Sequence, residues 1–99
     1  MRVELFYSDG CPNWAVADER LRDALRLAGR RDVLIERHSV ETPEQADEVG
    51  FLGSPTVRIN GRDLFAQGGE RVALSCRVFS TPTGLAGSPT VEQFLEALP

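Results

Sequence analysis

A short apolar segment followed by an amphipathic helix constrains the fold of this chain most strongly. Residues 3–7 are mainly apolar and end at the turn sequence Ser8-Asp9-Gly10, which is typical of a buried strand. From residue 12 to 28, apolar side chains recur at helical spacing with charged side chains between them. Pro12 suits the first turn of this helix, because the N–H that proline lacks has no partner there. The chain therefore begins with a β–α unit, and Cys11 lies at its turn.

The remaining segments extend this unit to the order β-α-β-α-β-β-α. Thr42 and Thr90 each precede a glutamine by three positions, which is the spacing of a capping box at a helix start. Strands joined through helices pair in parallel, so we expect an α/β fold with a central four-stranded mixed sheet flanked by helices. The predicted elements after the first helix are a strand within 33–40, a helix over 43–49, a strand over 57–59, a loop over 80–89 and a short helix after 90.

The fourth strand has two candidate positions. Asn60-Gly61 is a strong hairpin signal directly after the third strand, and residues 62–65 follow it. Residues 71–79 alternate more regularly between apolar and polar side chains. We prefer 71–79, which leaves 66–70 as a glycine-rich loop and points Cys76 toward the core.

Composition narrows the possible partners. The chain has 99 residues, the length of a single domain over 1–99, and a net charge of −4. Its basic residues are all arginines and are scattered, so it lacks the basic stripe of a nucleic-acid-binding protein. We find no apolar run long enough for a membrane span or a signal peptide. We therefore expect no nucleic-acid or membrane partner, and a cytoplasmic location in which thiols are reduced.

Cys11 is the strongest candidate for a reactive residue. A helix N-terminus carries partial positive charge and free N–H donors, which both favour a thiolate. Cysteines in this position have pKa values below the value of about 8.5 of a free thiol, and the thiolate attacks disulfides, peroxides and soft metals. The alternative is that Cys11 only packs as a small apolar residue. Asp9 and Asn13 flank Cys11 and are placed to change its reactivity.

Two segments of the chain resemble the thioredoxin-like superfamily. They are Cys11-Pro12-Asn13-Trp14 and Gly50–Val57, which reads GFLGSPTV, and both are in register with the predicted elements. The resemblance covers residues 2–61 well and the rest of the chain by topology alone. It implies a thioredoxin-like fold in which Pro55 is a cis-proline beside Cys11. The alternative is a trans-proline that begins an ordinary strand.

The same resemblance has implications for the substrate and for the mechanism. It implies that the Ser54 backbone is exposed and pairs with an extended peptide, strand to strand. Dithiol members have a second cysteine where this chain has Trp14, so the motif is similar to that of monothiol members. In those proteins another thiol resolves the mixed disulfide, which here leaves a low-molecular-weight thiol as co-substrate, a partner protein or Cys76. The substrate-binding candidates are Pro12, Trp14, Ser54 and Pro55.

Two of these residues have open interpretations. Cys76 alternates with apolar neighbours, which favours a buried core thiol over a resolving cysteine. A reversible disulfide with Cys11 requires Cα atoms within about 7 Å of each other, which the sequence does not establish. Trp14 either anchors the helix against the core or forms one wall of a substrate groove.

The other polar candidates are weaker indicators of a functional site than Cys11. We expect His38, near the end of the second strand, to be solvated or locally bonded and remote from Cys11. Arg58 and Arg77 are placed on strands and are able to steer an anionic substrate, although exposed strand arginines are usually only solvated. Two cysteines and one histidine are too few for a structural zinc site of the usual spacing, so we expect no metal ligands and no cofactor.

These observations support three classes of function. The first is a monothiol thiol–disulfide oxidoreductase that acts through Cys11 on a disulfide-bearing protein or a small thiol. The second is a non-catalytic thioredoxin-fold module that binds a peptide or a small thiol. The third, ranked lower, is soft-metal or organomercurial handling through Cys11 and Cys76, because small proteins with similar motifs are associated with mercury resistance. The exposed last strand is compatible with a monomer or a weak homodimer.

Overall fold

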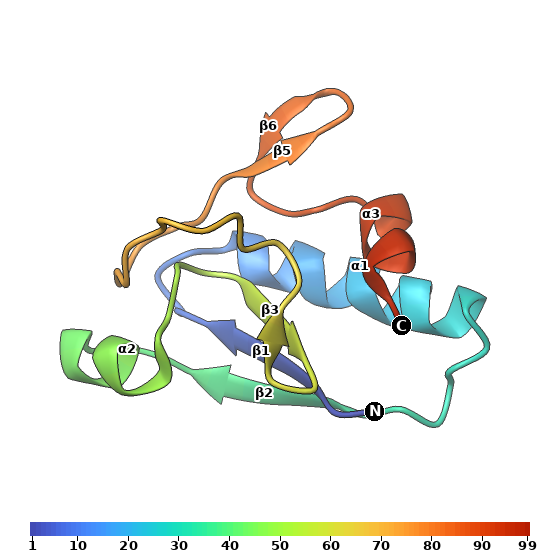
Figure 1. The fold of residues 1–99 in the computed structure, drawn as a ribbon, viewed down its shortest axis with the longest axis horizontal. Coiled ribbons are helices and arrows are strands. Elements are labelled where there is room, and N and C mark those ends of the chain that lie inside the picture. Colours follow the sequence, from blue (N-terminus) through green and yellow to red (C-terminus); the bar gives the residue numbers. More distant parts are fainter.

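The computed structural model describes residues 1–99 as an α/β fold with a four-stranded mixed sheet, a separate two-stranded sheet and three helices (Figure 1). None of the helices has the length and apolar character needed to cross a membrane. The elements in chain order are β1 (Val3–Tyr7), α1 (Asn13–Leu27), β2 (Ile35–Ser39), α2 (Pro43–Val49), β3 (Thr56–Ile59), β4 (Arg62–Asp63), β5 (Phe79–Thr81), β6 (Gly84–Ala86) and α3 (Val91–Ala97).

The main sheet has the strand order β2-β1-β3-β4. β1 and β2 are parallel and are joined through α1, as the sequence predicts. The expectation that the third strand is also parallel to them is wrong, because β3 pairs antiparallel with β1. The reason is the position of α2, whose Ala46 packs with Phe6 and Val40 at the carboxyl ends of β1 and β2. The chain therefore enters β3 at that end of the sheet and runs back along β1 (Figure 1).

The larger core lies between one face of the sheet and the helices α1 and α3. Its side chains come from β1, β3 and these two helices, so the apolar stripe predicted over 12–28 meets the inward face of the strands. The helix itself spans Asn13–Leu27, within one residue of the predicted bounds. The buried members are Val3, Leu5, Ala17, Leu21, Ala24, Leu25, Val57, Ile59 and Phe94.

Both predicted capping boxes form. The Thr42 side chain accepts from the amide of Gln45, and the Thr90 side chain accepts from the amide of Gln93. α2 ends at Gly50, whose left-handed φ of 66° is the usual conformation of a residue that closes a helix. The predicted bounds of 43–49 are therefore confirmed.

The prediction of a fourth strand over 71–79 is wrong. The fourth strand of the sheet is the short β4, which follows the Asn60-Gly61 turn directly. Within the predicted loop 80–89, β6 pairs with the end of β5 in a small hairpin.

The alternation in 71–79 misleads because its apolar side is exposed, while Arg77 on the other side faces the protein. Val72 and Val78 are 42% and 62% exposed, whereas Arg77 is buried. The guanidinium of Arg77 forms a fork with the Asp63 carboxylate at 3.0 and 3.2 Å, and both side chains are about nine-tenths buried. This ion pair fixes the long segment after β4 to the edge of the main sheet.

Arg77→Leu tests this role of the buried ion pair. The substitution leaves the Asp63 carboxylate buried without its partner, which typically costs about 3–5 kcal/mol. We expect the free energy of unfolding in urea to fall by about that amount. Arg71→Leu is the matched control, because Arg71 is exposed, and it is expected to change stability by less than about 0.5 kcal/mol. Equal effects of the two substitutions would contradict the assignment.

Candidate functional site

Cys11 lies on the turn between β1 and α1, one residue before the N-cap Pro12. Its amide donates to the Ser8 carbonyl at 3.0 Å, which closes the turn. No side chain caps the start of α1, so the partial positive charge of the helix N-terminus is not offset there. Cys11 is only 2% exposed in the disulfide-bonded structure, although a reactive thiol requires access to its substrate.

Cys11 is joined to Cys76 by a disulfide, with the two Cα atoms 5.8 Å apart. This separation is typical of disulfides. Cys76 is exposed, so the preferred interpretation as a buried core thiol is wrong. The cause is the inverted orientation of its segment, in which the neighbouring Arg77 takes the inward position.

The segment around Cys76 pairs with the chain that precedes Pro55. The Ser54 amide donates to the Ser75 carbonyl at 2.7 Å, and the Arg77 amide donates to the Ser54 carbonyl at 2.9 Å. Ser54 is fully buried. The expectation that its backbone is exposed for a peptide is therefore wrong, because residues 75–77 of the same chain occupy that edge.

The Ser54–Pro55 peptide bond is cis and lies beside Cys11, as the resemblance implies. The Ser54 carbonyl oxygen is 3.7 Å from the Cys11 sulfur. The Ser54 hydroxyl oxygen accepts from the Ser8 amide at 3.0 Å, which ties this loop to the turn that carries the cysteine. The two segments that carry the resemblance thus meet at one place in the structure.

Gly53 allows the close approach of the two segments. Its φ is 114°, a region that L side chains rarely adopt. A Cβ atom at this position would lie 3.0 Å from the Cβ of Arg77 and 3.3 Å from the carbonyl oxygen of Ser75. This role of Gly53 was missed in the sequence, although its place directly before Ser54-Pro55 was the available signal.

Asn13 and Trp14 flank the disulfide from the first turn of α1. The Asn13 amide nitrogen is 3.9 Å from the Cys11 sulfur, and this side chain fills the space where any side chain at position 87 would lie. Trp14 stacks on Tyr7 with ring centroids 4.2 Å apart and packs against the larger core. These contacts favour the interpretation of Trp14 as an anchor.

Glu41 holds the turn before Cys11 and was missed in the sequence. Its carboxylate accepts from the Asp9 amide at 3.0 Å and from the Ser39 hydroxyl at 2.8 Å. These two donors, the Asp9 amide first, hold the pKa of Glu41 below its usual range. Asp9 therefore contributes to the site through its backbone.

The two strand arginines are not simply solvated. The guanidinium of Arg77 forms the buried ion pair with the Asp63 carboxylate. Arg58 donates to the carbonyls of Val49 and Gly50 and lies over the Phe6 ring, 4.5 Å from its centroid. Both guanidiniums already have partners, so neither is free to steer an anionic substrate.

A pocket of about 660 Å³ opens next to the segment that carries Cys76. Half of its lining residues are hydrophobic, and Arg77 lies at its wall. It lies between the loop after β4 and the β5–β6 hairpin, and neither cysteine lines it. The principal lining side chains are Leu52, Phe65, Glu70, Arg77, Phe79 and Leu85.

Gly53→Ala tests whether docking of 75–77 holds the two cysteines together. The added Cβ meets Arg77 and Ser75, and overpacking of this kind costs about 1–3 kcal/mol. We measure the equilibrium between the Cys11–Cys76 disulfide and the dithiol in a dithiothreitol redox buffer. We expect its equilibrium constant to shift by about tenfold toward the dithiol. Gly84→Ala is the matched control, because Gly84 has the same kind of φ, 115°, with no atom near its Cβ position. An equal shift in both variants would mean that backbone strain alone is responsible.

Comparison with known proteins adds no relative to this picture. No protein-family model matches the chain, and no curated protein or solved structure matches it either. The interpretation of the site therefore rests on the geometry of Cys11, Cys76 and the Ser54–Pro55 loop.

Proposed function

We propose that this protein is a thioredoxin-like thiol–disulfide oxidoreductase with Cys11 as its nucleophile and Cys76 as its resolving cysteine. The observation that carries the proposal is the disulfide between these residues, formed where the segment of Cys76 pairs with the loop before Pro55. The Cys-Pro-Asn-Trp motif lacks a second cysteine at position 14, and Cys76 supplies the missing thiol from another part of the chain.

The surroundings of Cys11 favour a nucleophilic sulfur. The uncapped N-terminus of α1 places partial positive charge beside it, and the Asn13 amide nitrogen lies within reach as a donor to a thiolate. A thiolate is the form that attacks a disulfide.

The reaction that this arrangement supports has two exchange steps. The Cys11 thiolate attacks one sulfur of a substrate disulfide, the substrate S–S bond breaks, and the other substrate sulfur leaves as a thiolate. The Cys76 thiolate then attacks the Cys11 sulfur of the mixed disulfide and releases the second substrate thiolate. The substrate gains two electrons, and the protein ends as the Cys11–Cys76 disulfide.

Exposure determines how the protein returns to the dithiol. Cys76 is exposed and Cys11 is buried, so an incoming thiolate reaches the Cys76 sulfur first. Cys11 then leaves as a thiolate at the helix N-terminus. A second thiol of the reductant attacks the resulting mixed disulfide, frees Cys76 and converts the reductant to its own disulfide. A low-molecular-weight thiol or dithiol is the class of reductant that fits this route.

A second candidate function is binding of a soft cation by the reduced pair. The disulfide places the two sulfurs in direct contact, so the dithiolate offers two adjacent ligands to Hg²⁺ or Cu⁺. The non-catalytic peptide-binding alternative has no such support, because residues 75–77 cover the edge that it requires.

Single substitutions of the two cysteines distinguish their proposed roles. With a disulfide-linked model peptide as substrate, we expect Cys11→Ser to lose reductase activity, because the thiol at the helix N-terminus is gone and the remaining Cys76 has no second thiol to resolve a mixed disulfide. Cys76→Ser keeps the first step and loses the second, so a covalent adduct between Cys11 and one half of the peptide accumulates. Intact-protein mass spectrometry measures this adduct, and reductant releases it. Full activity of Cys11→Ser, or an adduct that forms on Cys76 in that variant as fast as on Cys11 in Cys76→Ser, would overturn the assignment.

Titration of the reduced protein with Hg²⁺ tests the second candidate. If the pair is a cation site, one equivalent binds and each single Cys→Ser variant loses most of the affinity, since one of two thiolate ligands is gone. Binding that is unchanged in Cys76→Ser would exclude a two-sulfur site. If the protein reduces disulfides and binds no Hg²⁺ through both cysteines, the oxidoreductase function is supported and the second candidate is excluded.

A further inference from the structure

A second group of side chains with metal-binding chemistry lies away from the disulfide. β1 and β2 pair in parallel with Glu4 opposite Glu36 and Phe6 opposite His38. Side chains alternate between the two faces of a strand, so Glu4, Glu36 and His38 lie on the face opposite the larger core. α2 and its small cluster of Phe6, Val40, Ala46 and Phe51 cover only one end of that face.

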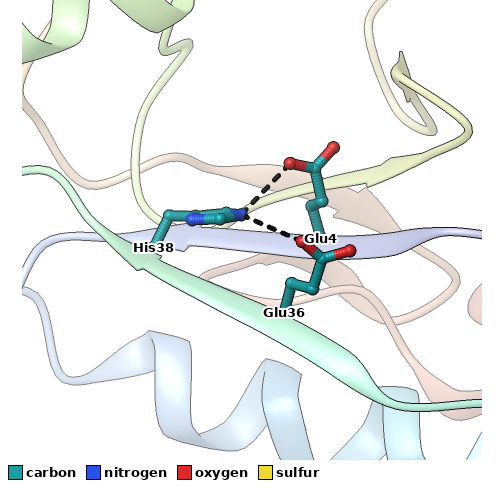
Figure 2. Close-up of side chains that lie close together, drawn as sticks. All are labelled: Glu4, Glu36 and His38. Atoms are coloured by element: carbon teal, nitrogen blue, oxygen red, sulfur yellow. Dashed lines mark ion pairs between the residues drawn. The ribbon is translucent and has the colours of Figure 1, made fainter.

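The three side chains converge on one point (Figure 2). His38 Nε2 is 3.1 Å from Glu4 Oε2 and 4.0 Å from Glu36 Oε1. One ligand atom from each residue lies within 4.8 Å of the others. The His38 ring is held in place by Phe6, with ring centroids 4.8 Å apart.

His38 Nε2 is a buried nitrogen without a hydrogen bond. It lies close to Glu4 Oε2, but it has no partner with hydrogen-bond geometry, and its exposed area is negligible. A buried polar atom without a hydrogen bond destabilises the folded state. A bound ion that this nitrogen ligates is one explanation for its position. The Glu4 carboxylate beside it is itself nine-tenths buried.

Arg2 contacts both carboxylates. Its guanidinium donates to Glu36 at 2.8 and 3.1 Å and lies 3.3 Å from Glu4. These bonds hold the pKa of Glu36 below its usual range. One arginine balances only one of the two carboxylates, and its side chain is 61% exposed, so it is free to move aside.

We propose that Glu4, Glu36 and His38 form a binding site for a divalent cation of the Zn²⁺ class. Imidazole nitrogen and carboxylate oxygen are ordinary ligands of Zn²⁺, at about 2.0–2.2 Å. A tetrahedral ion with such bonds holds its ligand atoms about 3.3–3.5 Å apart. The separation of 3.1 Å between His38 and Glu4 is close to this value, whereas Glu36, 4.0 Å from His38, moves inward when the ion binds. The cation displaces Arg2 from Glu4, and water completes its coordination. Spacing along the chain does not reveal these ligands, because they come together only through the parallel register of β1 and β2.

Calorimetric titration with Zn²⁺ tests this site, with the Cys11–Cys76 disulfide intact so that no thiol competes. We expect one equivalent to bind and the affinity to fall by about tenfold or more in His38→Ala and in Glu36→Gln. Arg2→Met is expected to bind more tightly, because it removes the competing cation. Glu48→Gln, which changes an exposed carboxylate on α2, is the matched control and is expected to bind like the unaltered protein.

The thermal midpoint gives an independent measurement. A ligand that binds only the folded state raises Tm, so Zn²⁺ is expected to raise it in the unaltered protein and in Glu48→Gln but not in Glu36→Gln. Glu36 is exposed on an edge strand, so this variant keeps the test valid if His38→Ala does not fold. Absence of Zn²⁺ binding, or equal binding by Glu36→Gln, would overturn the proposal.

Discussion

The arrangement of the candidate site depends on the pairing of residues 75–77 with the backbone of Ser54. Two short backbone hydrogen bonds join the segments, and the absence of a side chain at Gly53 lets them approach. The buried fork between Arg77 and Asp63 holds the same segment from its other side. The disulfide thus joins two segments that these contacts already position. We expect the loss of any of these contacts to lower the tendency of the two sulfurs to form the disulfide.

Much of the fold follows from local patterns in the sequence. The first strand, the amphipathic helix after it and both capping boxes depend on interactions between residues close in the chain, which periodicity and spacing reveal. The position of the fourth strand does not. Residues 71–79 have the alternation of a strand, but the ion pair with Asp63 turns Arg77 inward, and a pattern cannot anticipate one buried ion pair.

The candidate site likewise has one part that the sequence predicts and another part that depends on contacts between residues distant in the chain. Local patterns in the sequence place Cys11 at a helix start, whereas the position of Pro55 beside it is implied only by the resemblance to the thioredoxin-like superfamily. Whether Cys76 reaches Cys11 depends on a long-range approach across 65 positions, which no local signal encodes. The group of Glu4, Glu36 and His38 is likewise invisible along the chain, since only the parallel register of two strands brings it together.

The length of chain between the two cysteines links their chemistry to folding as a whole. A cross-link that closes a loop of this size, 65 positions, lowers the entropy of the unfolded chain by an amount worth about 4 kcal/mol. By thermodynamic linkage, the folded state favours formation of the bond to the same extent that the bond favours the folded state. The tendency of this pair to form a disulfide therefore depends on the stability of the whole domain. A substitution far from either sulfur that destabilises the fold lowers this tendency.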